Sequence, residues 1–408
     1  MRSVHLRTAA LLTAVALPLG GCSGGGSAAG GTPSATSSSA SSTSAPSSSA
    51  ASSSSGTESS APASAGDRVD AVLASMSREE QIAQLFLVGV PLADLGQGTA
   101  LAGQGVGGIF MAGRSTMSAD ELAGITQGWQ GRADVVRFWV AVDQEGGNVQ
   151  TLTGPGFEKL PTAQEQGKLP KAQLEELAGG MGASLASAGI NLDLAPVVDV
   201  VPAGTEQQNQ PIGVFGRQYG STTAEVEAAA SVVVDGLAEH GVTATLKHFP
   251  GLGRVRGNTD TSDQVVDTQT TPDDPQVRLF GTLARSPAEP FVMTSSAVYA
   301  QIDDTRPAGM SPTVVDGLLR GELGFEGVVV SDDVGAAAAV QSLPPGKRAL
   351  RCLYAGGTLV LTVDASLYPE MLSAVVQRDR TDDAFSHRID DAVRTALLAK
   401  DRAGLRAP

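Results

Sequence analysis

The feature that most constrains the fold of this chain is a regular alternation of strand-like and helix-like segments between residues 67 and 405. Eight apolar, strand-like segments occupy residues 87–90, 108–111, 138–142, 192–198, 244–247, 291–293, 328–331 and 358–362. Helix-like stretches occupy residues 69–85, 119–131, 171–188, 223–240, 312–322, 347–355 and 383–400. This alternation predicts an α/β fold with parallel strands, either a closed (β/α)8 barrel of the TIM type or a doubly wound open sheet. Eight units in one domain favour the barrel, and no Gly-rich phosphate loop follows the first strand.

One strand carries the strongest chemical signal. Val328 to Val330 form a β-branched run typical of a strand buried on both faces, and Ser331, Asp332 and Asp333 follow it directly. Two such Asp residues can cap a following helix, predicted here over residues 335–340. They can also supply chemistry, because barrel enzymes place catalytic groups at the carboxyl ends of their strands.

Polar residues also follow the other predicted strands, and this favours a catalytic role for Asp332 over simple capping. They form a ring at one end of successive strands: Asp143, Gln144, Glu145, Asp199, Lys247, His248, Thr294, Ser295, Ser296, Asp332 and Asp333. Such a ring is typical of the active site of a barrel enzyme.

The N-terminus indicates export. Arg2 and Arg7 precede an apolar run that ends in Leu19-Gly20-Gly21-Cys22, which resembles the bacterial lipobox. We therefore expect a signal peptide over residues 1–21, acylation of Cys22, and attachment to the extracytoplasmic face of the cell membrane. The alternative is an ordinary signal peptide with an incidental cysteine. Residues 22–66 are rich in Ser, Ala and Gly and are expected to form a disordered tether ahead of the domain at 67–405.

Charge and composition exclude several classes of partner. The formal net charge is −15, which argues against a basic surface for nucleic acid. No His, Cys and carboxylate cluster has the spacing of metal ligands, so neither a metal nor an organic cofactor is expected. Cys352 lies in an apolar helical setting and is expected in the core, without a disulfide partner in the chain.

Several motifs together resemble glycoside hydrolase family 3, specifically its bacterial β-N-acetylglucosaminidases with a single barrel domain. In chain order they are Val140-Ala141-Val142-Asp143-Gln144-Glu145-Gly146-Gly147, Asn191-Leu192-Asp193-Leu194-Ala195-Pro196-Val197-Val198-Asp199-Val200, Lys247-His248-Phe249-Pro250-Gly251, Val292-Met293-Thr294 and Glu322 to Val328 leading into Ser331-Asp332-Asp333. The resemblance runs in order along essentially the whole domain, and it implies a TIM barrel that acts on a carbohydrate.

The resemblance assigns the nucleophile and the residues that bind sugar. It makes Asp332 the nucleophile of a covalent retaining hydrolysis, which needs an ionised carboxylate under the anomeric carbon. Asp143 matches the family residue that grips sugar hydroxyls, Lys247 and His248 match the pair that contacts the sugar, and Arg217 resembles the sugar-binding Arg with altered spacing before it. Met293 is expected on the pocket floor, and the alternative for His248 is a core histidine.

The chain departs from the family at the general acid/base. The glucosaminidases usually carry Asp-Ser-His on a mobile loop, whereas this chain has Asp260 in the Asp position and Ser262 in the His position. Serine cannot donate a proton usefully near neutral pH. We consider three explanations: Asp260 or Asp263 supplies the acid with a raised pKa, the enzyme relies on good leaving groups or substrate assistance, or the domain binds sugar without turnover. The Gly-containing loop around Asp260 is expected to be mobile and able to close over substrate.

The function expected from the resemblance is that of an exported, lipid-anchored β-glycosidase acting on terminal β-N-acetylglucosaminides of cell-wall muropeptides or glycans. The alternative is a sugar-binding or sensing lipoprotein on a degraded hydrolase frame. Retention of Asp332 favours the first, and Ser262 favours the second.

Overall fold

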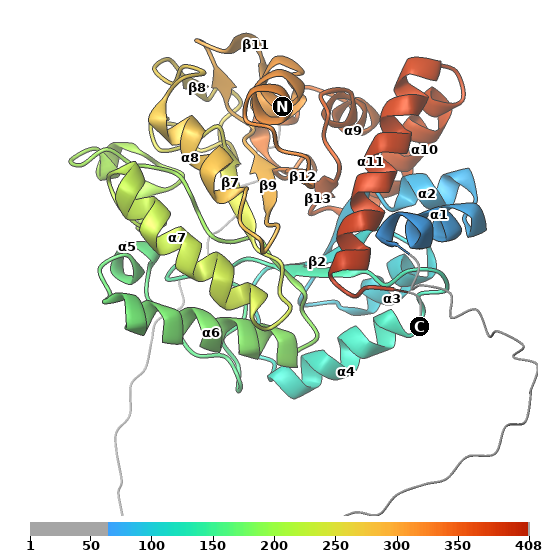
Figure 1. Ribbon diagram of the computed structural model, residues 1–408, viewed down its shortest axis with the longest axis horizontal. Helices are drawn as coiled ribbons and strands as arrows, with labels where there is room; N and C mark the ends of the chain where they lie inside the picture. Colours follow the sequence, from blue (N-terminus) through green and yellow to red (C-terminus); the bar gives the residue numbers. More distant parts are fainter. Residues whose placement is uncertain (1–63, 407–408) are drawn as a thin grey trace, which may run out of the picture. The chain divides into compact units, whose positions relative to one another are not determined.

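The computed structural model describes residues 64–406, and its centre is a ring of strands surrounded by helices (Figure 1). The signal peptide, Cys22 and nearly all of the expected tether lie outside the described residues. Eight strands form the ring: β1 (Phe86–Pro91), β2 (Gly108–Ala112), β3 (Trp139–Val142), β6 (Leu192–Asp193), β7 (Thr245–Phe249), β9 (Phe291–Thr294), β12 (Val329–Ser331) and β13 (Val360–Thr362). Each lies within or overlaps a segment expected from the sequence.

The strands close into a parallel barrel. Two parallel sheets have the orders β13-β1-β2-β3-β6 and β12-β9-β7. Parallel bridges pair Leu192 with Thr243 between β6 and β7, and Val330 with Leu359 between β12 and β13, so both gaps between the sheets are joined. The expected (β/α)8 barrel is therefore confirmed, and the open sheet is excluded because no strand edge is left unpaired in the ring.

The helices follow the strands in the order that a barrel requires. Their bounds are α1 (Ala65–Ser75), α2 (Arg78–Ala83), α3 (Gly96–Gly103), α4 (Ala119–Gln130), α5 (Ala163–Gln166), α6 (Lys171–Ser187), α7 (Thr223–Ala238), α8 (Pro275–Leu283), α9 (Pro345–Tyr354), α10 (Tyr368–Asp379) and α11 (Asp383–Arg402). Figure 1 shows α4, α6 and α7 on the outside of the strands, and each belongs to the connection between two consecutive strands of the ring.

Three helix predictions need correction. The stretch expected as one helix over residues 69–85 is two helices. α1 ends at Ser75, and Ser77 begins α2 as its N-cap, in a capping box with Glu80. Residues 313–322 form a π-helix instead of an α-helix. The helix expected over residues 335–340 is reduced to a 3₁₀ turn, Ala338–Val340. The N–H groups of Ala338 and Ala339, which a helix beginning at Gly335 would bond to carbonyls one turn earlier, donate instead to the carbonyls of Asp260 and Thr259.

Four α-helices were not expected from the sequence: α3, the single-turn α5, α8 and α10. α3 is rich in Gly, so its local propensity is low and packing against the barrel must stabilise it. α8 does carry a start signal, since Asp274 accepts from the backbone of Gln276 and Pro275 occupies the first helical position.

Short additional strands lie in the loops at the carboxyl end of the barrel. β4 (Gln144–Gly146) and β5 (Val149–Gln150) form a hairpin directly after β3. β8 (Val266–Asp267), β10 (Val298–Tyr299) and β11 (Asp303–Pro307) form a three-stranded sheet from two different loops. Their pairing holds together the loops at this end of the barrel.

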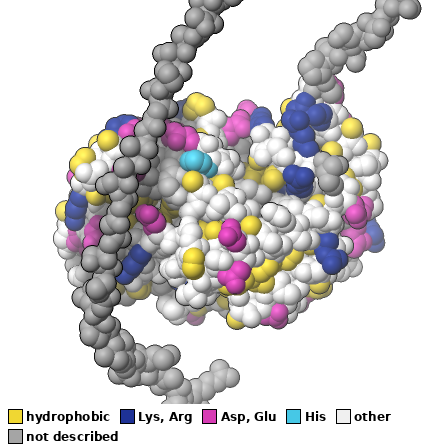
Figure 2. Space-filling model, turned by 90° about the horizontal axis from the view of Figure 1, so that it is seen from below, with side chains coloured by type: hydrophobic (Ala, Val, Ile, Leu, Met, Phe, Trp, Pro, Cys, Tyr) yellow, Lys and Arg dark blue, Asp and Glu magenta, His cyan; other side chains and the backbone are white. Residues whose placement is uncertain are grey.

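The barrel core is apolar, and several of its strands are fully buried. Cys352 is one of its members and is a free thiol, as expected. Within residues 64–406, no helix combines the length and apolar character that a membrane crossing requires. On the part of the surface visible in Figure 2, acidic and basic side chains are scattered in small groups, and several of them lie side by side.

Candidate active site

A cavity of about 340 Å³ opens at the carboxyl ends of the strands. All seven catalytic or sugar-binding residues expected from the sequence within the domain line it: Asp143, Arg217, Lys247, His248, Asp260, Met293 and Asp332. They come from strands and loops spread over nearly 190 positions of the chain, and the barrel brings them together because every parallel strand ends at the same face.

A larger hollow, of about 840 Å³, lies at the opposite end of the barrel. It is lined by the amino ends of strands, including Trp139 and Phe291, and by the end of α11. Size alone does not identify the site, because barrel enzymes place their chemistry at the carboxyl ends. We therefore take the smaller cavity as the candidate active site.

Asp332 is held by the strand that precedes it. β12 pairs with β9 so that Ser331 lies opposite Thr294, and the backbone N–H of Asp332 donates to the Thr294 carbonyl at 3.1 Å. On the other side, the Ser331 hydroxyl accepts from the N–H of Leu361 at 3.0 Å. The position of the carboxylate is thus set by two neighbouring strands.

Burial raises the pKa of Asp332 to about 6, the negative charge of Asp260 adds to the rise, and the charge of His248 opposes it. Above pH 6 the ionised form of Asp332 therefore predominates. A carboxylate in this state near neutral pH is able to act as a nucleophile.

Asp333 has a structural task. One of its oxygens accepts from the N–H groups of Gly335 and Val363, at 2.8 and 2.9 Å, and the other accepts from Ala336 and Ala337, at 2.7 and 3.2 Å. With both oxygens committed to backbone, Asp333 fixes the turn after Asp332 and leaves Asp332 as the carboxylate of this pair that is free to react.

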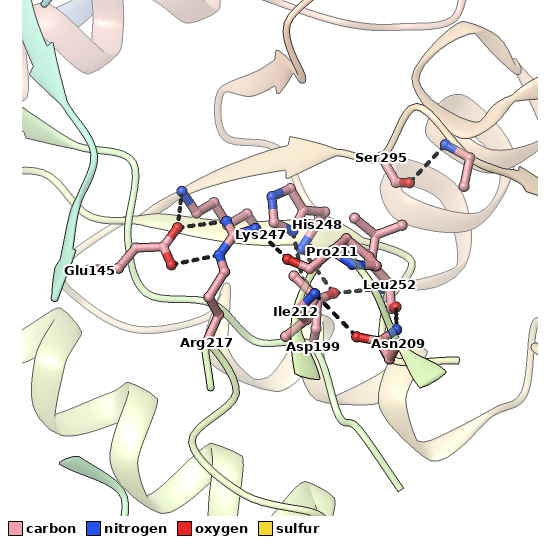
Figure 3. Close-up of polar contacts among 12 residues, drawn as sticks. Glu145, Asp199, Asn209, Pro211, Ile212, Arg217, Lys247, His248, Leu252 and Ser295 are labelled. Atoms are coloured by element: carbon pink, nitrogen blue, oxygen red, sulfur yellow. Dashed lines mark hydrogen bonds and ion pairs between the residues drawn. The ribbon is translucent and has the colours of Figure 1, made fainter. Parts of the chain in front are cut away.

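Asp143, Lys247 and Arg217 line the cavity and are joined to the buried Glu145 in a network of alternating charge, of which Figure 3 shows Glu145, Lys247 and Arg217. Lys247 donates to Asp143 at 2.7 Å and forms an ion pair with Glu145 at 2.6 Å. Arg217 binds both oxygens of Glu145, at 2.7 and 2.9 Å, and donates to the Pro211 carbonyl at 2.8 Å. We call Asp143, Glu145, Lys247 and Arg217 the ion network.

The ion network is internally balanced. Burial alone would raise the pKa of Glu145, but the charges and hydrogen bonds of Arg217 and Lys247 outweigh it and lower that pKa to about 2. Two carboxylates thus face two cations with little exposure to water, apart from Asp143, whose side chain is 27% exposed. Asp143 is therefore the member placed to accept hydrogen bonds from a ligand, and the other members hold it in position.

His248 is oriented by a buried carboxylate. Its Nδ1 lies 2.8 Å from Asp199, whose other oxygen accepts from the backbone N–H groups of His248 and Leu252 (Figure 3). Because Nδ1 is engaged, Nε2 is the ring nitrogen available on the cavity side. The core-histidine interpretation is excluded, since His248 lines the cavity.

The loop after β7 forms the lid of the cavity. Asp260 lines the cavity but is an exposed residue, and Asp263 is exposed as well. The carbonyl groups of Thr259 and Asp260 accept from Ala339 and Ala338, so the loop touches the segment that follows Asp332. Asp260 therefore lacks the burial that the first of the three explanations invokes.

The base of the same loop is fixed rather than mobile. The buried side chain of Asn209 donates to the carbonyls of Leu252 and Val255 at 2.7 and 2.8 Å, and accepts from Ile212 and Gly213. Gly253 packs so closely that a Cβ there would lie 1.8 Å from the Val200 carbonyl oxygen. These contacts hold the loop in place as far as Val255.

Sequence reasoning did not assign roles to three residues of the site. Glu145 and Asp199 belong to the ring of strand-end residues, but their tasks depend on Arg217 and His248, which lie 72 and 49 positions away. No sequence pattern indicated a role for Asn209, because an Asn that is buried between two loops cannot be distinguished in the sequence from an exposed loop Asn. Within residues 64–406, no group of three His, Cys, Asp or Glu side chains is arranged to hold a metal ion.

The family model described as the glycosyl hydrolase family 3 N terminal domain matches residues 77–397. A beta-hexosaminidase of Stenotrophomonas maltophilia is 36% identical over 256 residues, which are 59% of this chain and 71% of the relative. The beta-hexosaminidase LpqI of Mycobacterium tuberculosis is 31% identical over 350 residues, covering 81% of this chain and 85% of the relative.

Among solved structures, a beta-N-acetylhexosaminidase from Beutenbergia cavernae has a TM-score of 0.75 at 44% identity. The match covers 80% of this chain and 99% of that one. The likeness therefore extends over nearly the whole barrel and includes the elements that build the cavity.

Proposed function

The chain belongs to glycoside hydrolase family 3, and from this premise we propose that it hydrolyses terminal β-N-acetylhexosaminides through a covalent glycosyl ester on Asp332. The observation that carries the proposal is the position of Asp332, largely ionised near neutral pH and facing the ion network across one cavity. The hexosaminidase activity named for the relatives supports the choice of substrate class.

The first half of the reaction forms the ester. The carboxylate of Asp332 attacks the anomeric carbon as the glycosidic bond breaks, and the electron pair of that bond leaves with the departing oxygen. Asp143, Lys247, His248 and Arg217 hold the sugar, with Met293 beneath it. In the second half, water cleaves the ester, so the product keeps the β configuration.

Proton transfer to the departing oxygen is the open step of the mechanism, because Ser262 replaces the loop histidine. We propose that a group at or near Asp260 assists the departure, since Asp260 lines the cavity and its charge acts on Asp332. Its exposure makes it a weaker acid catalyst than a buried His–Asp pair, so the enzyme is expected to favour leaving groups that need little protonation.

Location and natural substrate are part of the same proposal. The lipobox-like Leu19-Gly20-Gly21-Cys22 and the long polar segment after it support a lipid-anchored enzyme on the extracytoplasmic face of the membrane. Cell-wall muropeptides and other glycans with terminal N-acetylglucosamine are the substrates within reach there.

The test is release of p-nitrophenol from p-nitrophenyl β-N-acetylglucosaminide by the purified protein, beside its Asp332→Asn variant. We expect turnover by the wild type and a loss of at least about 10³-fold in the variant, because the nucleophile is removed. The corresponding glucoside is the specificity control and should react more slowly.

A second candidate function is sugar binding without turnover, favoured by Ser262 and by the exposure of Asp260. It predicts that neither protein releases p-nitrophenol while N-acetylglucosamine still binds to both. Calorimetric titration with N-acetylglucosamine therefore separates the two functions.

A further inference from the structure

A buried carboxyl group beside the ion network has no part in the mechanism above. Asp193 lies on β6. It pairs with Val142 of β3 on one side, and on the other its N–H donates to the carbonyl of Thr243, just before β7. Its side chain is 0% exposed. The groups that act on it electrostatically are Asp143 and Glu145 from the side of β3 and Lys247 from β7, and Asp193 in turn acts on the phenol of Tyr219.

The hydrogen bonds of Asp193 are too few for a buried anion. One oxygen accepts a single backbone N–H, from Gln144 at 2.9 Å, and the other has no partner among the described residues. Lys247 is already committed to Asp143 and Glu145. The hydroxyl of Thr245 is likewise buried without a partner, and strand alternation puts it on the same face of β7 as Lys247. A buried carboxylate without a cation or several donors takes up a proton.

We infer that Asp193 is a positioning residue that works as a neutral carboxylic acid beside the ion network. This inference rests on the proposed function, because the task it assigns is to keep the sugar-binding side chains in place. With Asp193 neutral, the ion network contains two anions and two cations. An ionised Asp193 would add a third anion, which would compete with Asp143 and Glu145 for Lys247 and displace the groups that hold the sugar.

The burial of Asp193 raises its pKa to about 8, in agreement with this geometry. The proton is therefore retained at neutral pH and lost under mildly alkaline conditions. We expect kcat/KM of the wild type to fall above about pH 8, mainly through a rise in KM, with a loss of about tenfold one pH unit higher.

The decisive variant is Asp193→Asn, which preserves the shape and the neutral state at all pH values. Its kcat/KM should stay within about threefold of its neutral-pH value over the range in which the wild type loses about tenfold. A variant whose alkaline limb coincides with that of the wild type would overturn the inference.

A measurement independent of activity is the unfolding temperature of Asp193→Asn relative to the wild type, followed against pH. A carboxyl whose pKa is raised on folding stabilises the folded state below the unfolded pKa, and that stabilisation is lost as pH rises through the folded pKa. The variant should therefore gain stability relative to the wild type between about pH 4 and pH 8 and gain nothing further above. The surface variant Glu176→Gln is the control and should show no such gain. If the difference in unfolding temperature between the variant and the wild type stays constant or shrinks between about pH 4 and pH 8, Asp193 is ionised in the folded protein.

Should Asp193→Asn fail to fold, carbon-13 NMR of aspartate-labelled wild type decides the question. One carboxyl resonance should keep the chemical shift of a protonated acid until about pH 8. If no aspartate titrates in that range, the inference is wrong. The unfolding and NMR measurements need no turnover, so failure of the proposed hydrolase activity would be seen separately.

Discussion

At the scale of single residues, the account depends on the ionisation of Asp332. Its pKa is raised by burial first and then by the negative charge of Asp260, which lines the same cavity. The ionisation of Asp332 thus depends on a loop residue that is not bonded to it, and removing the charge of that residue has a defined consequence.

We predict that Asp260→Asn moves the acid limb of kcat/KM to lower pH, by about half a unit to one unit. The amide removes a negative charge that disfavours ionisation of Asp332, so the pKa of Asp332 falls and the active form persists at lower pH. Measurement with the p-nitrophenyl substrate isolates this effect, because its leaving group needs little protonation.

Asp263→Asn is the matched control, since Asp263 lies exposed on the same loop and does not line the cavity. Its acid limb should coincide with that of the wild type. An unchanged limb in Asp260→Asn would show that the charge of Asp260 does not reach the nucleophile.

The sequence was informative at the residues that end strands. A β-branched run followed by Ser331-Asp332-Asp333 placed the nucleophile candidate correctly at a cavity, because a strand's end is a local property of the chain. The sequence did not indicate which of these residues contact one another. The bidentate contact of Arg217 with Glu145 and the neutral state expected of Asp193 arise from packing between distant segments, which no local pattern records.

At the scale of elements, the loop after β7 is where this chain differs from the pattern it resembles. Its base is pinned by Asn209 and by the close approach of Gly253 to Val200, while residues around Asp260 and Ser262 lie at the cavity and toward solvent. The base of the loop thus fixes its position, and the outer part is where the proposed acid assistance lies.

We predict that Ser262→His increases hydrolysis of substrates whose leaving group is a sugar by about ten- to a hundredfold. The imidazole would supply a proton near the departing oxygen, with Asp260 two positions earlier. Turnover of the p-nitrophenyl substrate should change little. The rates are compared with those of Ser262→Ala, which should behave as the wild type on both substrates; a large loss in Ser262→Ala would show that the serine itself is used.

We predict that Asn209→Ala lowers the free energy of unfolding by about 2–4 kcal/mol, because four buried backbone groups lose their hydrogen-bond partner. KM should rise as well, since Asn209 joins the loop that carries Arg217 to the loop that carries Asp260. Urea denaturation measures the first effect. Gln97→Ala, an exposed amide bonded only to Asp94, should stay within about 0.5 kcal/mol of the wild type, and an equal loss in both variants would contradict the account.

The sequence predicted the repeated barrel strands well, and it predicted poorly the helices whose formation depends on tertiary packing. All eight barrel strands were expected, because buried strands carry apolar β-branched runs. The Gly-rich α3 was missed, since its stability comes from the barrel rather than from propensity. The helix expected after Asp333 was wrong because the N–H groups of Ala338 and Ala339 bond to the loop carbonyls of Asp260 and Thr259 instead of to the preceding turn.

At the scale of the whole molecule, the proposal places a glycosidase domain on a lipid-modified stalk. The barrel accounts for residues 77–397 by family match, and the export signal is expected from the residues before it. A net charge of −15 leaves acylation, rather than a basic surface, as the means of attachment proposed for the chain.

We predict that Cys22→Ser shifts the protein from the membrane fraction to the soluble fraction of the producing cells. In the proposed anchoring the thiol of Cys22 accepts the lipid, so its loss should remove the anchor while the domain keeps its activity. Immunoblots of the two fractions measure the distribution. Ser27→Ala should remain with the membrane, and a Cys22→Ser protein that also stays there would refute anchoring through this residue.

The most direct test of the central claim is to trap the glycosyl ester. A 5-fluoro analogue of an N-acetylglucosaminyl fluoride forms the ester and slows its hydrolysis, so the modified peptide can be found by mass spectrometry after proteolysis. We predict one added sugar on the peptide that contains Asp332, and none in Asp332→Asn. A label on another carboxylate, or no label while the wild type turns over substrate, would contradict the assignment of Asp332 as the nucleophile.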